Sequence, residues 1–458
     1  MNMTRLVSPY TLLIAVCLLL YVLLYEYISE PSIWFISKER TWSMWLEPFD
    51  SPSNVDLNTN TTKTTAGENY TAITSKDKSK SMTPQQITLK ITGKQNNRTS
   101  DQPRFRTYPT DQPSVEQRET LMFPLKKDNL NQYPNWDFED VYIRDKLPRN
   151  TICPQSLVHS EDQSFKKAFI PDIQLYLHRK LLNVKEWNRL AHFNNPFGFM
   201  GYTNYTEIKE VVDLIPEPKE PLLSLGKRGC IRCAVVATGG ILNGSRMGKE
   251  IDSHDYVFRM NGAVTKGYEE DVGNRTSVYV HSAHAIVQSP LIFQKCGYKE
   301  APHDEGIKYV LIPEGNRDFR WLQGLFGKKP VVKGEYKNKL PWLYYSGQFD
   351  KKRFYVLHPD FLRYIRNRFL RSKALKASLW SIFRPTNGAF TLFLALHTCD
   401  EVDAYGFITE NHHKYPNYYF DKQSDTKVIF YANHDYSLEI KTWKKLNDTK
   451  IIRLYQRI

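Results

Sequence analysis

Hydrophobic and polar positions follow a regular pattern from Cys230 to the C-terminus. Short apolar runs, each long enough for one strand, alternate there with polar stretches. The run CAVVAT at 233–238 is followed by two glycines, which is typical of a buried strand that leads into a turn. We predict further strands in the comparable runs at 255–264, 277–283, 307–314, 353–359, 401–407 and 451–458.

One longer segment between these runs has helical spacing. The stretch TNGAFTLFLALHTC at 386–399 places apolar residues on one helical face, and we predict a helix there. Strands that alternate with helices indicate an α/β fold in which a mostly parallel sheet is flanked by helices. A chain of 458 residues is long enough for one large domain with accessory segments, or for two domains.

The first thirty residues contain an apolar segment of membrane-spanning length. Pro9–Ile28 carries one charge, Glu26, and a helix needs about 20 apolar residues to cross the bilayer core. No small-residue cleavage pattern follows, so we predict an uncleaved transmembrane signal-anchor at 9–28. The short tail at 1–8 favours a cytosolic N-terminus, although Arg5 is its one basic residue. The rest of the chain is then lumenal or extracellular.

A polar segment separates this span from the alternating pattern. Residues 51–117 are rich in Asn, Thr, Ser, Lys and Gln and show almost no apolar periodicity. Such a segment cannot bury enough apolar surface to offset the entropy lost on ordering. We predict a disordered stem region at 29–140 and a folded domain at 141–458. Sequons that agree with a lumenal location stand at Asn60, Asn69, Asn97, Asn204, Asn243, Asn274 and Asn447.

Composition narrows the class of binding partner. The formal net charge of +14 favours an acidic partner, which is a nucleotide, a nucleic acid, an anionic lipid or an acidic sugar. The sequence has no zinc-finger spacing and no RNA-binding motif, which argues against nucleic acid. The aromatic fraction of 13% agrees equally well with carbohydrate recognition and with an aromatic core.

Cysteine usage leaves two kinds of site open. Cys17 lies in the predicted span, so five lumenal cysteines remain, which allow at most two disulfides and one leftover thiol. The pair CIRC at 230–233 has the spacing of a zinc or redox site. No second pair or nearby HxxxH completes a metal site, and an oxidising lumen favours disulfides.

Two segments have features of a phosphate-binding loop. In TGGILNGSRMG at 238–248, a strand runs into a glycine-rich turn and a helix, a geometry in which backbone N–H groups face an anion. The segment is neither a G-x-G-x-x-G fingerprint nor a Walker A loop, so a structural turn explains it equally well. In RPTNG at 384–388, small polar residues stand where a helix begins, which also describes an ordinary N-cap.

A third candidate lies in NHDYSLEI at 433–440. His434 precedes Glu439 by five residues near the start of an amphipathic helix. The spacing alone fits a catalytic base, a metal ligand and a polar residue at a helix start.

These segments resemble the motifs of one enzyme family. The stretch CAVVATGGILNGSRMGKEIDSHDYVFRMNGAVTKGYEEDVGNRTSVYV resembles the large sialyl motif of animal sialyltransferases. RPTNGAFTLFLALHTCDEVDAYGF is similar to their small sialyl motif, and NHDYSLE is similar to their short C-terminal H-x4-E motif. The order and spacing also match, and the likeness covers roughly Cys230 to the end. ILNGSRMGKEIDSHDYVFRMNGAV and YGFITENHHKY resemble most closely the branch that acts on O-linked N-acetylgalactosamine (GalNAc).

The resemblance implies a Rossmann-like single-domain glycosyltransferase of the GT-A variant, in a type II Golgi membrane protein with a lumenal catalytic domain. The implied reaction transfers sialic acid from CMP-sialic acid to the 6-hydroxyl of GalNAc on mucin-type glycoproteins, with inversion and without a metal or other cofactor. The chain has no D-x-D segment, which agrees with a CMP donor because one phosphate carries less charge than two. The alternatives are galactose or sialic acid as acceptor, and a non-catalytic glycan-binding relative.

The resemblance also implies roles for individual residues. Contacts with the donor are implied for two asparagines and a helix start, which are Asn243, Asn261, Thr386, Asn387 and Gly388. His434 is the implied general base, because histidine suits proton removal from a hydroxyl at Golgi pH. Glu439 is expected to orient a ring or hold a loop. Asn243 is also a sequon asparagine, and we predict that it is unglycosylated because a glycan would obstruct the nucleotide.

One short motif departs from the family pattern. NYYFD at 417–421 has Tyr418 where a histidine is expected, and His412 and His413 stand nearby out of register. Tyr418 must then substitute through its hydroxyl, or the enzyme is slower or altered. The departure is also the feature that favours the non-catalytic alternative. Tyr419 is retained as an implied donor contact.

The resemblance finally implies a pairing of the cysteines. It joins Cys233 of the large motif to Cys399 of the small motif. Cys153 with Cys230 is then the remaining pair, and Cys296 is left over. The first bond would tie together the two segments that are expected to bind the nucleotide.

Overall fold

The computed structural model describes residues 120–122, 125–127, 130, 134–135, 139–146, 149–224, 229–377, 380–421 and 426–457. The predicted span at 9–28 and most of the predicted stem lie outside the described residues. Among the helices that are described, none combines the length and the apolar character needed to cross a bilayer.

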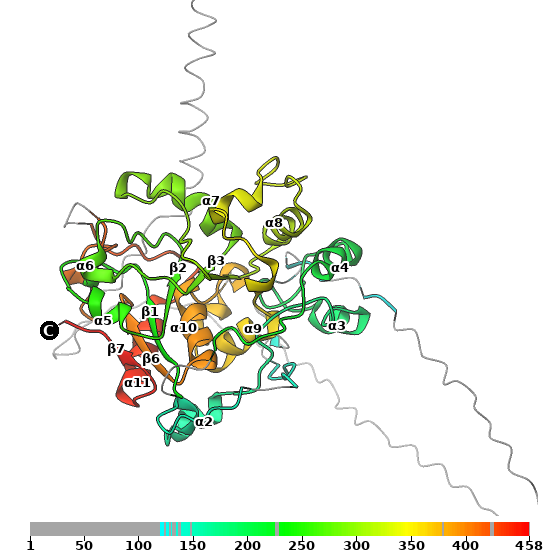
Figure 1. Ribbon diagram of the computed structural model, residues 1–458. Helices are drawn as coiled ribbons and strands as arrows, with labels where there is room; N and C mark the ends of the chain where they lie inside the picture. The colour runs from blue at the N-terminus through cyan, green and yellow to red at the C-terminus, as the bar shows by residue number, and fades with distance from the viewer. Residues whose placement is uncertain are drawn as a thin grey trace, which may run out of the picture. The chain divides into compact units, whose positions relative to one another are not determined.

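A sheet of seven parallel strands organises the described residues, in the order β5-β4-β3-β2-β1-β6-β7 (Figure 1). The strands are β1 (Arg232–Val236), β2 (Tyr256–Met260), β3 (Val278–His281), β4 (Lys308–Leu311), β5 (Phe354–Val356), β6 (Glu401–Tyr405) and β7 (Arg453–Leu454). Each strand coincides with one of the predicted apolar runs. The prediction of an α/β fold with a mostly parallel sheet is therefore confirmed.

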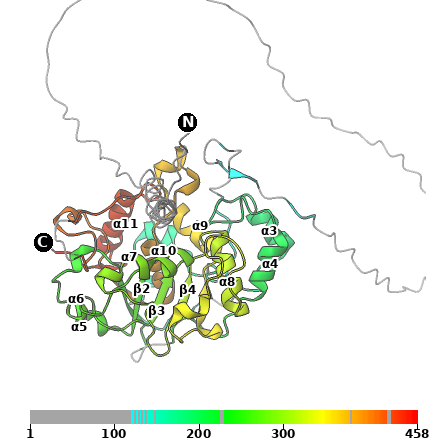
Figure 2. The same cartoon turned by 90° about the horizontal axis from the view of Figure 1, so that it is seen from above.

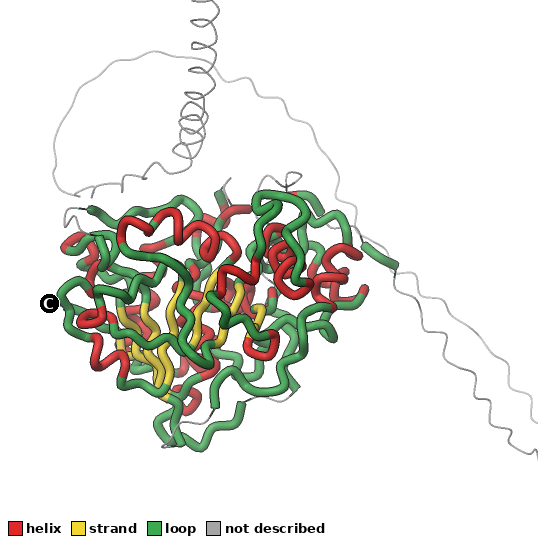
Figure 3. The backbone as a smooth tube through the Cα atoms, turned by 45° about the horizontal axis from the view of Figure 1, so that its top comes forward, coloured by secondary structure: helices red, strands yellow, loops and turns green. Residues whose placement is uncertain are grey.

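Helices cover both faces of the sheet, as the views in Figures 2 and 3 show. They are α2 (Gln163–Ala168), α3 (Val184–Leu190), α4 (Tyr205–Asp213), α5 (Gly248–Asp252), α6 (Glu269–Val272), α7 (Ala283–Ile292), α8 (Asn316–Gly327), α9 (Pro359–Arg368), α10 (Asn387–Thr398) and α11 (Tyr436–Asp448). α10 is the helix predicted at 386–399. The sequence pattern indicated no element before Cys230, where α3 and α4 begin at side-chain caps from Asn183 and Asn204 rather than in long apolar runs.

Alternate residues of β1, an interior strand of the sheet, belong to two cores. Cys233 and Val235 of β1 pack in the hydrophobic cluster that contains α10, whereas Ala234 and Val236 pack in a second cluster with residues of α5 and α6. Because side chains alternate between the faces of a strand, burial on both faces requires a continuous apolar run. This requirement explains the uninterrupted apolar character of CAVVAT.

The strand order reverses between β1 and β6. The chain first builds the sheet outward from β1 through β2, β3, β4 and β5, and β6 then pairs with the opposite edge of β1. In open α/β sheets, ligands bind beyond the carboxyl ends of the strands at such a reversal. The segments after Val236 and after Tyr405 are therefore the expected walls of a site.

Residues ahead of position 141 also contact the folded domain. We call the described residues within 120–130 the N-terminal strap. Four of its carbonyl groups accept hydrogen bonds from the domain. The pairs are Asn188 Nδ2 to Thr120 O (2.9 Å), Trp187 Nε1 to Met122 O (3.1 Å), Gly201 N to Leu125 O (2.8 Å) and Trp380 Nε1 to Leu130 O (3.3 Å). Folded structure thus begins by Thr120, and the predicted boundary at 141 is too late.

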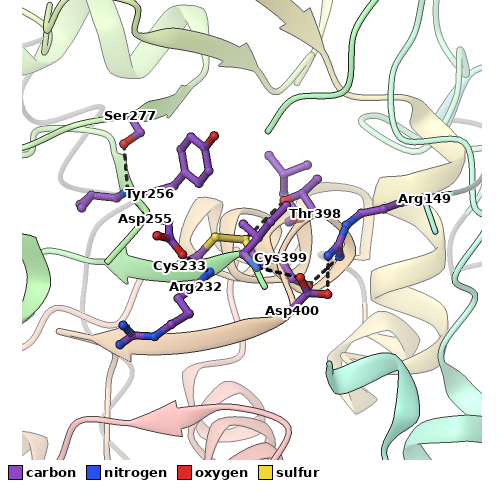
Figure 4. Close-up of a disulfide and its surroundings, with 12 residues drawn as sticks. Arg149, Arg232, Cys233, Asp255, Tyr256, Ser277, Thr398, Cys399 and Asp400 are labelled. Carbon is purple, nitrogen blue, oxygen red and sulfur yellow. Dashed lines mark hydrogen bonds and ion pairs between the residues drawn. A yellow bond between two sulfur atoms is a disulfide. The ribbon is translucent and has the colours of Figure 1, made fainter. Parts of the chain in front are cut away.

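The described residues contain two disulfides, and both have the predicted pairing. Cys233–Cys399 links the second residue of β1 to the residue after α10, across a sequence separation of 166 (Figure 4). Cys153–Cys230 spans a separation of 77. Because Cys230 and Cys233 bond to different partners, the CIRC segment is neither a zinc pair nor a redox pair.

Candidate active site

A cavity of about 280 Å³ lies where the strand order reverses. One wall is the loop 237–241 after β1, and another is the segment 406–409 after β6. The start of α10, residues within 412–418 and the segment that leads into α11 also line it. The predicted site residues that line this cavity are Asn261, Thr386, Asn387, Gly388, Tyr418, His434 and Glu439.

The glycines of the first loop permit close packing of backbones. A Cβ atom added to Gly239 would lie 2.4 Å from Gly406 O, and one added to Gly240 would lie 1.9 Å from Pro416 O. Both distances are far below van der Waals contact, so no other residue fits at either position without a shift of the backbone. The loop therefore needs its glycines to bring the segments after β1 and β6 together.

Two of the predicted donor contacts form one hydrogen-bonded unit. Asn387 Nδ2 donates to Asn261 Oδ1 (3.0 Å), which joins the start of α10 to the residue after β2. Asn261 has a φ of 51°, a left-handed conformation that asparagine tolerates better than most residues. Its carbonyl oxygen accepts a hydrogen bond from the hydroxyl of Tyr279. The two amides are thus held in place before any ligand binds.

The first turn of α10 has the properties of an anion site. Thr386 is the N-cap, and its Oγ1 accepts a hydrogen bond from Ala389 N (3.1 Å). The N–H groups of Asn387 and Gly388 have no hydrogen-bond partner among the described residues. A Cβ added to Gly388 would make only ordinary contacts, the shortest at 3.4 Å. The fold does not require glycine there, and its small size leaves the helix N-terminus open to the cavity.

Glu439, a residue of α11, also holds the start of α10 in place. Its Oε1 accepts a hydrogen bond from Thr386 N (2.8 Å), and its Oε2 accepts one from Thr386 Oγ1 (2.8 Å). Burial raises the pKa of Glu439 to about 7, although the two bonds from Thr386 oppose this shift. The described contacts of Glu439 therefore hold the start of α10, which agrees with the expectation of a supporting residue.

The raised pKa of Glu439 predicts a pH dependence of stability. The folded protein binds this proton more tightly than the unfolded chain. The contribution to stability is therefore complete below the ordinary glutamate pKa of 4.5 and is lost as the pH rises through about 7. We expect the free energy of unfolding to fall by on the order of 2 kcal/mol between pH 5 and pH 7.5 through this group. Urea denaturation at both pH values measures it. Glu439→Gln should remove the contribution of this group to the change in unfolding free energy between the two pH values, whereas Glu410→Gln, at an exposed site, should not. The same change in the wild type and in both variants would contradict the prediction.

His434 has one ring nitrogen bonded and the other available. The residue precedes Asp435, the N-cap of α11, and its Nδ1 lies 2.8 Å from Arg384 O. A carbonyl oxygen only accepts, so Nδ1 carries the proton of the neutral ring and Nε2 carries the lone pair. No described residue bonds to Nε2. Burial and the charge of Arg384 lower the pKa of His434 to about 3, so the ring is neutral near physiological pH.

Arg384 was missed by sequence reasoning, although it connects most of the site. Its Nη1 donates to Asn387 Oδ1 (3.1 Å), and its Nη2 forms an ion pair with Glu314 Oε1 (2.7 Å). Its backbone N donates to Asn433 O (3.0 Å), and its carbonyl oxygen holds His434. One feature of the sequence could have indicated its role, namely its position two residues before Thr386 in the segment RPTNG. Arg384 therefore positions both the start of α10 and the imidazole ring.

Comparison with known proteins identifies the family. The model of glycosyltransferase family 29 (sialyltransferase) matches residues 176–451, which is more than half of the chain. The chain belongs to this family. The family predicted from the sialyl motifs is therefore confirmed.

Two relatives and one solved structure show the extent of the similarity. The chain is 44% identical over 342 residues to alpha-N-acetylgalactosaminide alpha-2,6-sialyltransferase 1 of Gallus gallus, covering 73% of this chain and 60% of that protein. It is 38% identical over 331 residues to alpha-N-acetylgalactosaminide alpha-2,6-sialyltransferase 2 of Mus musculus, covering 71% of this chain and 88% of that protein. A crystal structure of a mammalian sialyltransferase is 25% identical, with a TM-score of 0.47, over 68% of this chain and 100% of that one.

Tyr418 lines the cavity at the position where the sequence comparison with the family motif expects a histidine. It forms a β-bridge with Gly239, and its ring stacks on Phe420 with centroids 5.0 Å apart. Its hydroxyl shares a hydrogen bond with Tyr431. His412 lines the same cavity although it is out of register in the sequence, and its Nδ1 is buried without a hydrogen-bond partner among the described residues. The cavity therefore contains a second histidine besides His434.

Asn243 and Tyr419 lie outside the lining of the cavity. Asn243 is exposed, and its Nδ2 donates to Tyr419 O (2.9 Å). Tyr419 is buried, and its hydroxyl donates to Val264 O. The predicted contacts of the two residues with the donor stay predictions. The prediction that Asn243 is unglycosylated also stays a prediction.

Proposed function

We propose that this sialyltransferase transfers sialic acid from CMP-sialic acid to the 6-hydroxyl of GalNAc that is O-linked to Ser or Thr of glycoproteins. One observation carries the proposal: the lone pair of His434 Nε2 and the open N-terminus of α10 belong to the same cavity. A base and an anion site side by side suit a reaction that removes a proton and releases a phosphate. The GalNAc acceptor and the linkage are supported by the names of the relatives.

The proposed step is a single displacement. O6 of GalNAc attacks the anomeric carbon of sialic acid from the side opposite the phosphate, while the carbon–oxygen bond to CMP breaks and the centre inverts. The hydroxyl proton passes to His434 Nε2, and the electron pair of the broken bond leaves on the phosphate of CMP. The negative charge of the bound donor raises the pKa of His434 above its value in the free protein, which makes the ring a better base in the complex.

Charge on the departing phosphate is stabilised by fixed donors of the protein. The N–H groups of Asn387 and Gly388 and the dipole of α10 attract it, and these groups need little reorganisation because Glu439 already holds Thr386. We include no metal and no other cofactor in this step, because one phosphate needs less neutralisation than a diphosphate. The proposed location is the Golgi membrane, with residues 9–28 as a single span and the catalytic domain in the lumen.

A non-catalytic glycan-binding role is the second candidate, and the specific observation in its favour is Tyr418 in place of histidine. His412 in the same cavity weakens that argument, because a histidine is available on the same loop. An alternative within the enzyme class is transfer to galactose or to sialic acid.

An acceptor panel tests these functions. The full chain is incubated with CMP-sialic acid and with glycopeptides that end in GalNAc, galactose or sialic acid, and the products undergo linkage analysis. We expect the α-2,6 linkage to GalNAc. Transfer to galactose or sialic acid alone would support the other acceptor class, and glycopeptide binding without turnover would support the non-catalytic role. Either result would contradict the proposal.

A further inference from the structure

A second cavity adjoins the proposed active site. It has a volume of about 640 Å³ and shares Arg384 with the first cavity. Asn433 lines the second cavity, and the next residue, His434, lines the first. The backbone of Arg384 bonds to both of these residues. The second cavity therefore lies next to the proposed base, His434, and the side chain of Arg384 borders both cavities.

The lining of this cavity is polar and rich in amide side chains. Asn194 Nδ2 donates to Ser381 O (2.6 Å), and Asn195 Nδ2 donates to Met200 O (3.0 Å). The Oδ1 atoms of both asparagines have no hydrogen-bond partner among the described residues, so they are acceptors that a ligand can use. Amide groups of this kind complement the N–H and C=O groups of an extended peptide backbone.

The charge at the rim of the cavity is positive. Lys126 and Lys127 of the N-terminal strap are exposed there, and neither forms an ion pair with a described residue. Glu314 is the one carboxylate of the lining, and Arg317 and Arg384 lie 2.8 Å and 2.7 Å from its two oxygens. Because two arginines already neutralise that carboxylate, the charge of the two lysines remains available to a ligand.

The strap holds the lysines in a defined place. They follow Leu125, which bonds to Gly201, and precede Leu130, which bonds to the indole of Trp380. Trp380 is itself buried in a small hydrophobic cluster against which Leu130 packs. The two lysines are therefore fixed between two anchors on the folded domain and form one wall of the cavity.

We propose that the second cavity binds the polypeptide on either side of the glycosylated Ser or Thr of the acceptor, and that Lys126 and Lys127 favour acidic residues in that polypeptide. This inference rests on the proposed function. A GalNAc whose 6-hydroxyl faces His434 remains attached through its reducing end to a polypeptide, and the adjoining cavity offers a polar space for that chain. The excess of positive charge then discriminates among acceptors by their flanking residues.

The test compares the wild-type full chain with K126E/K127E on three glycopeptides. Each carries GalNAc on one Thr, and they differ only in flanking residues, which are acidic, neutral or basic. GalNAc α-methyl glycoside, which has no peptide, is the reference acceptor. Relative to this reference, we expect kcat/KM for the acidic glycopeptide to fall about threefold to tenfold in K126E/K127E, the range for one or two exposed charge contacts. The basic glycopeptide should improve, and added salt should reduce both effects.

A matched control and a second readout separate the possible outcomes. K351E/K352E reverses an adjacent, exposed lysine pair that lines neither cavity, and it should leave the ratios unchanged. Equal changes on every acceptor, or no change on any, would overturn the peptide site. Failure of the wild type to use any acceptor would instead reject the proposed function. In that event, binding of the labelled acidic glycopeptide is measured by fluorescence anisotropy. The proposed peptide site requires that this binding be weaker in K126E/K127E than in the wild type.

Discussion

Replacing His434 with alanine is expected to lower kcat by about 10²- to 10⁴-fold, which is the usual contribution of a general base. The affinity for CMP should stay near that of the wild type, because the proposed phosphate contacts come from the start of α10. Initial rates with CMP-sialic acid and a GalNAc glycopeptide measure the first quantity, and calorimetry with CMP measures the second. Since the pKa of the free ring is about 3, its protonation should not limit the wild-type kcat/KM at mildly acidic pH.

Two further variants separate catalysis from structure. His434→Asn keeps an N–H donor that can reach Arg384 O but removes the lone pair, so it should be as inactive as His434→Ala and more stable. His413→Ala changes an exposed histidine outside the cavity lining and should retain activity. A His434→Ala protein with wild-type kcat would eliminate the assignment of His434 as the base.

Removal of the Cys233–Cys399 bond is expected to have the largest effect on stability. The substitution C233A/C399A should lower the free energy of unfolding by about 2–5 kcal/mol. The bond closes a sequence separation of 166, so its loss restores much conformational freedom to the unfolded chain. Both cysteines are fully buried, and the two missing sulfur atoms also leave a gap between β1 and the end of α10. Chemical denaturation of the non-reduced proteins measures the difference.

The other cysteines provide the controls for this experiment. Cys296→Ser changes a thiol outside both disulfides and should cost far less stability. C153A/C230A opens a separation of only 77 and should cost somewhat less than C233A/C399A in the chain-entropy model. Unchanged stability of C233A/C399A, or free thiols at Cys233 and Cys399 in non-reducing peptide mapping, would refute the prediction.

The sheet and the location of the cavity could be predicted because they depend on local patterns. A strand of a parallel sheet that is buried on both faces must be apolar without interruption, and such runs are visible one by one in the sequence. The cap of α10 is also local, since Thr386 bonds to Ala389 only three residues away. The pairing of the cysteines followed from the family motifs rather than from any local pattern.

Contacts between distant segments could not be predicted in the same way. Glu439 bonds to Thr386, which lies 53 residues earlier, and no local feature of either residue indicates the other. Tyr418 and Tyr419 are neighbours of equal character, and the one that lines the cavity is selected by the bridge between Gly239 and Tyr418. The sequence places the strap in the predicted stem because its backbone carbonyls bond to Trp187 and Trp380, and no local side-chain pattern indicates such bonds.

The anchoring of the strap makes the position of any proteolytic cut ahead of the domain important for specificity. A protease that cuts before Thr120 releases a fragment that retains the strap, including Lys126 and Lys127. A cut after Leu130 removes those lysines together with the carbonyl groups of Met122 and Leu130, to which the indoles of Trp187 and Trp380 donate. If the second cavity selects acceptor peptides as proposed, fragments cut on either side of the strap would differ in acceptor preference, although the residues around His434 are identical in both.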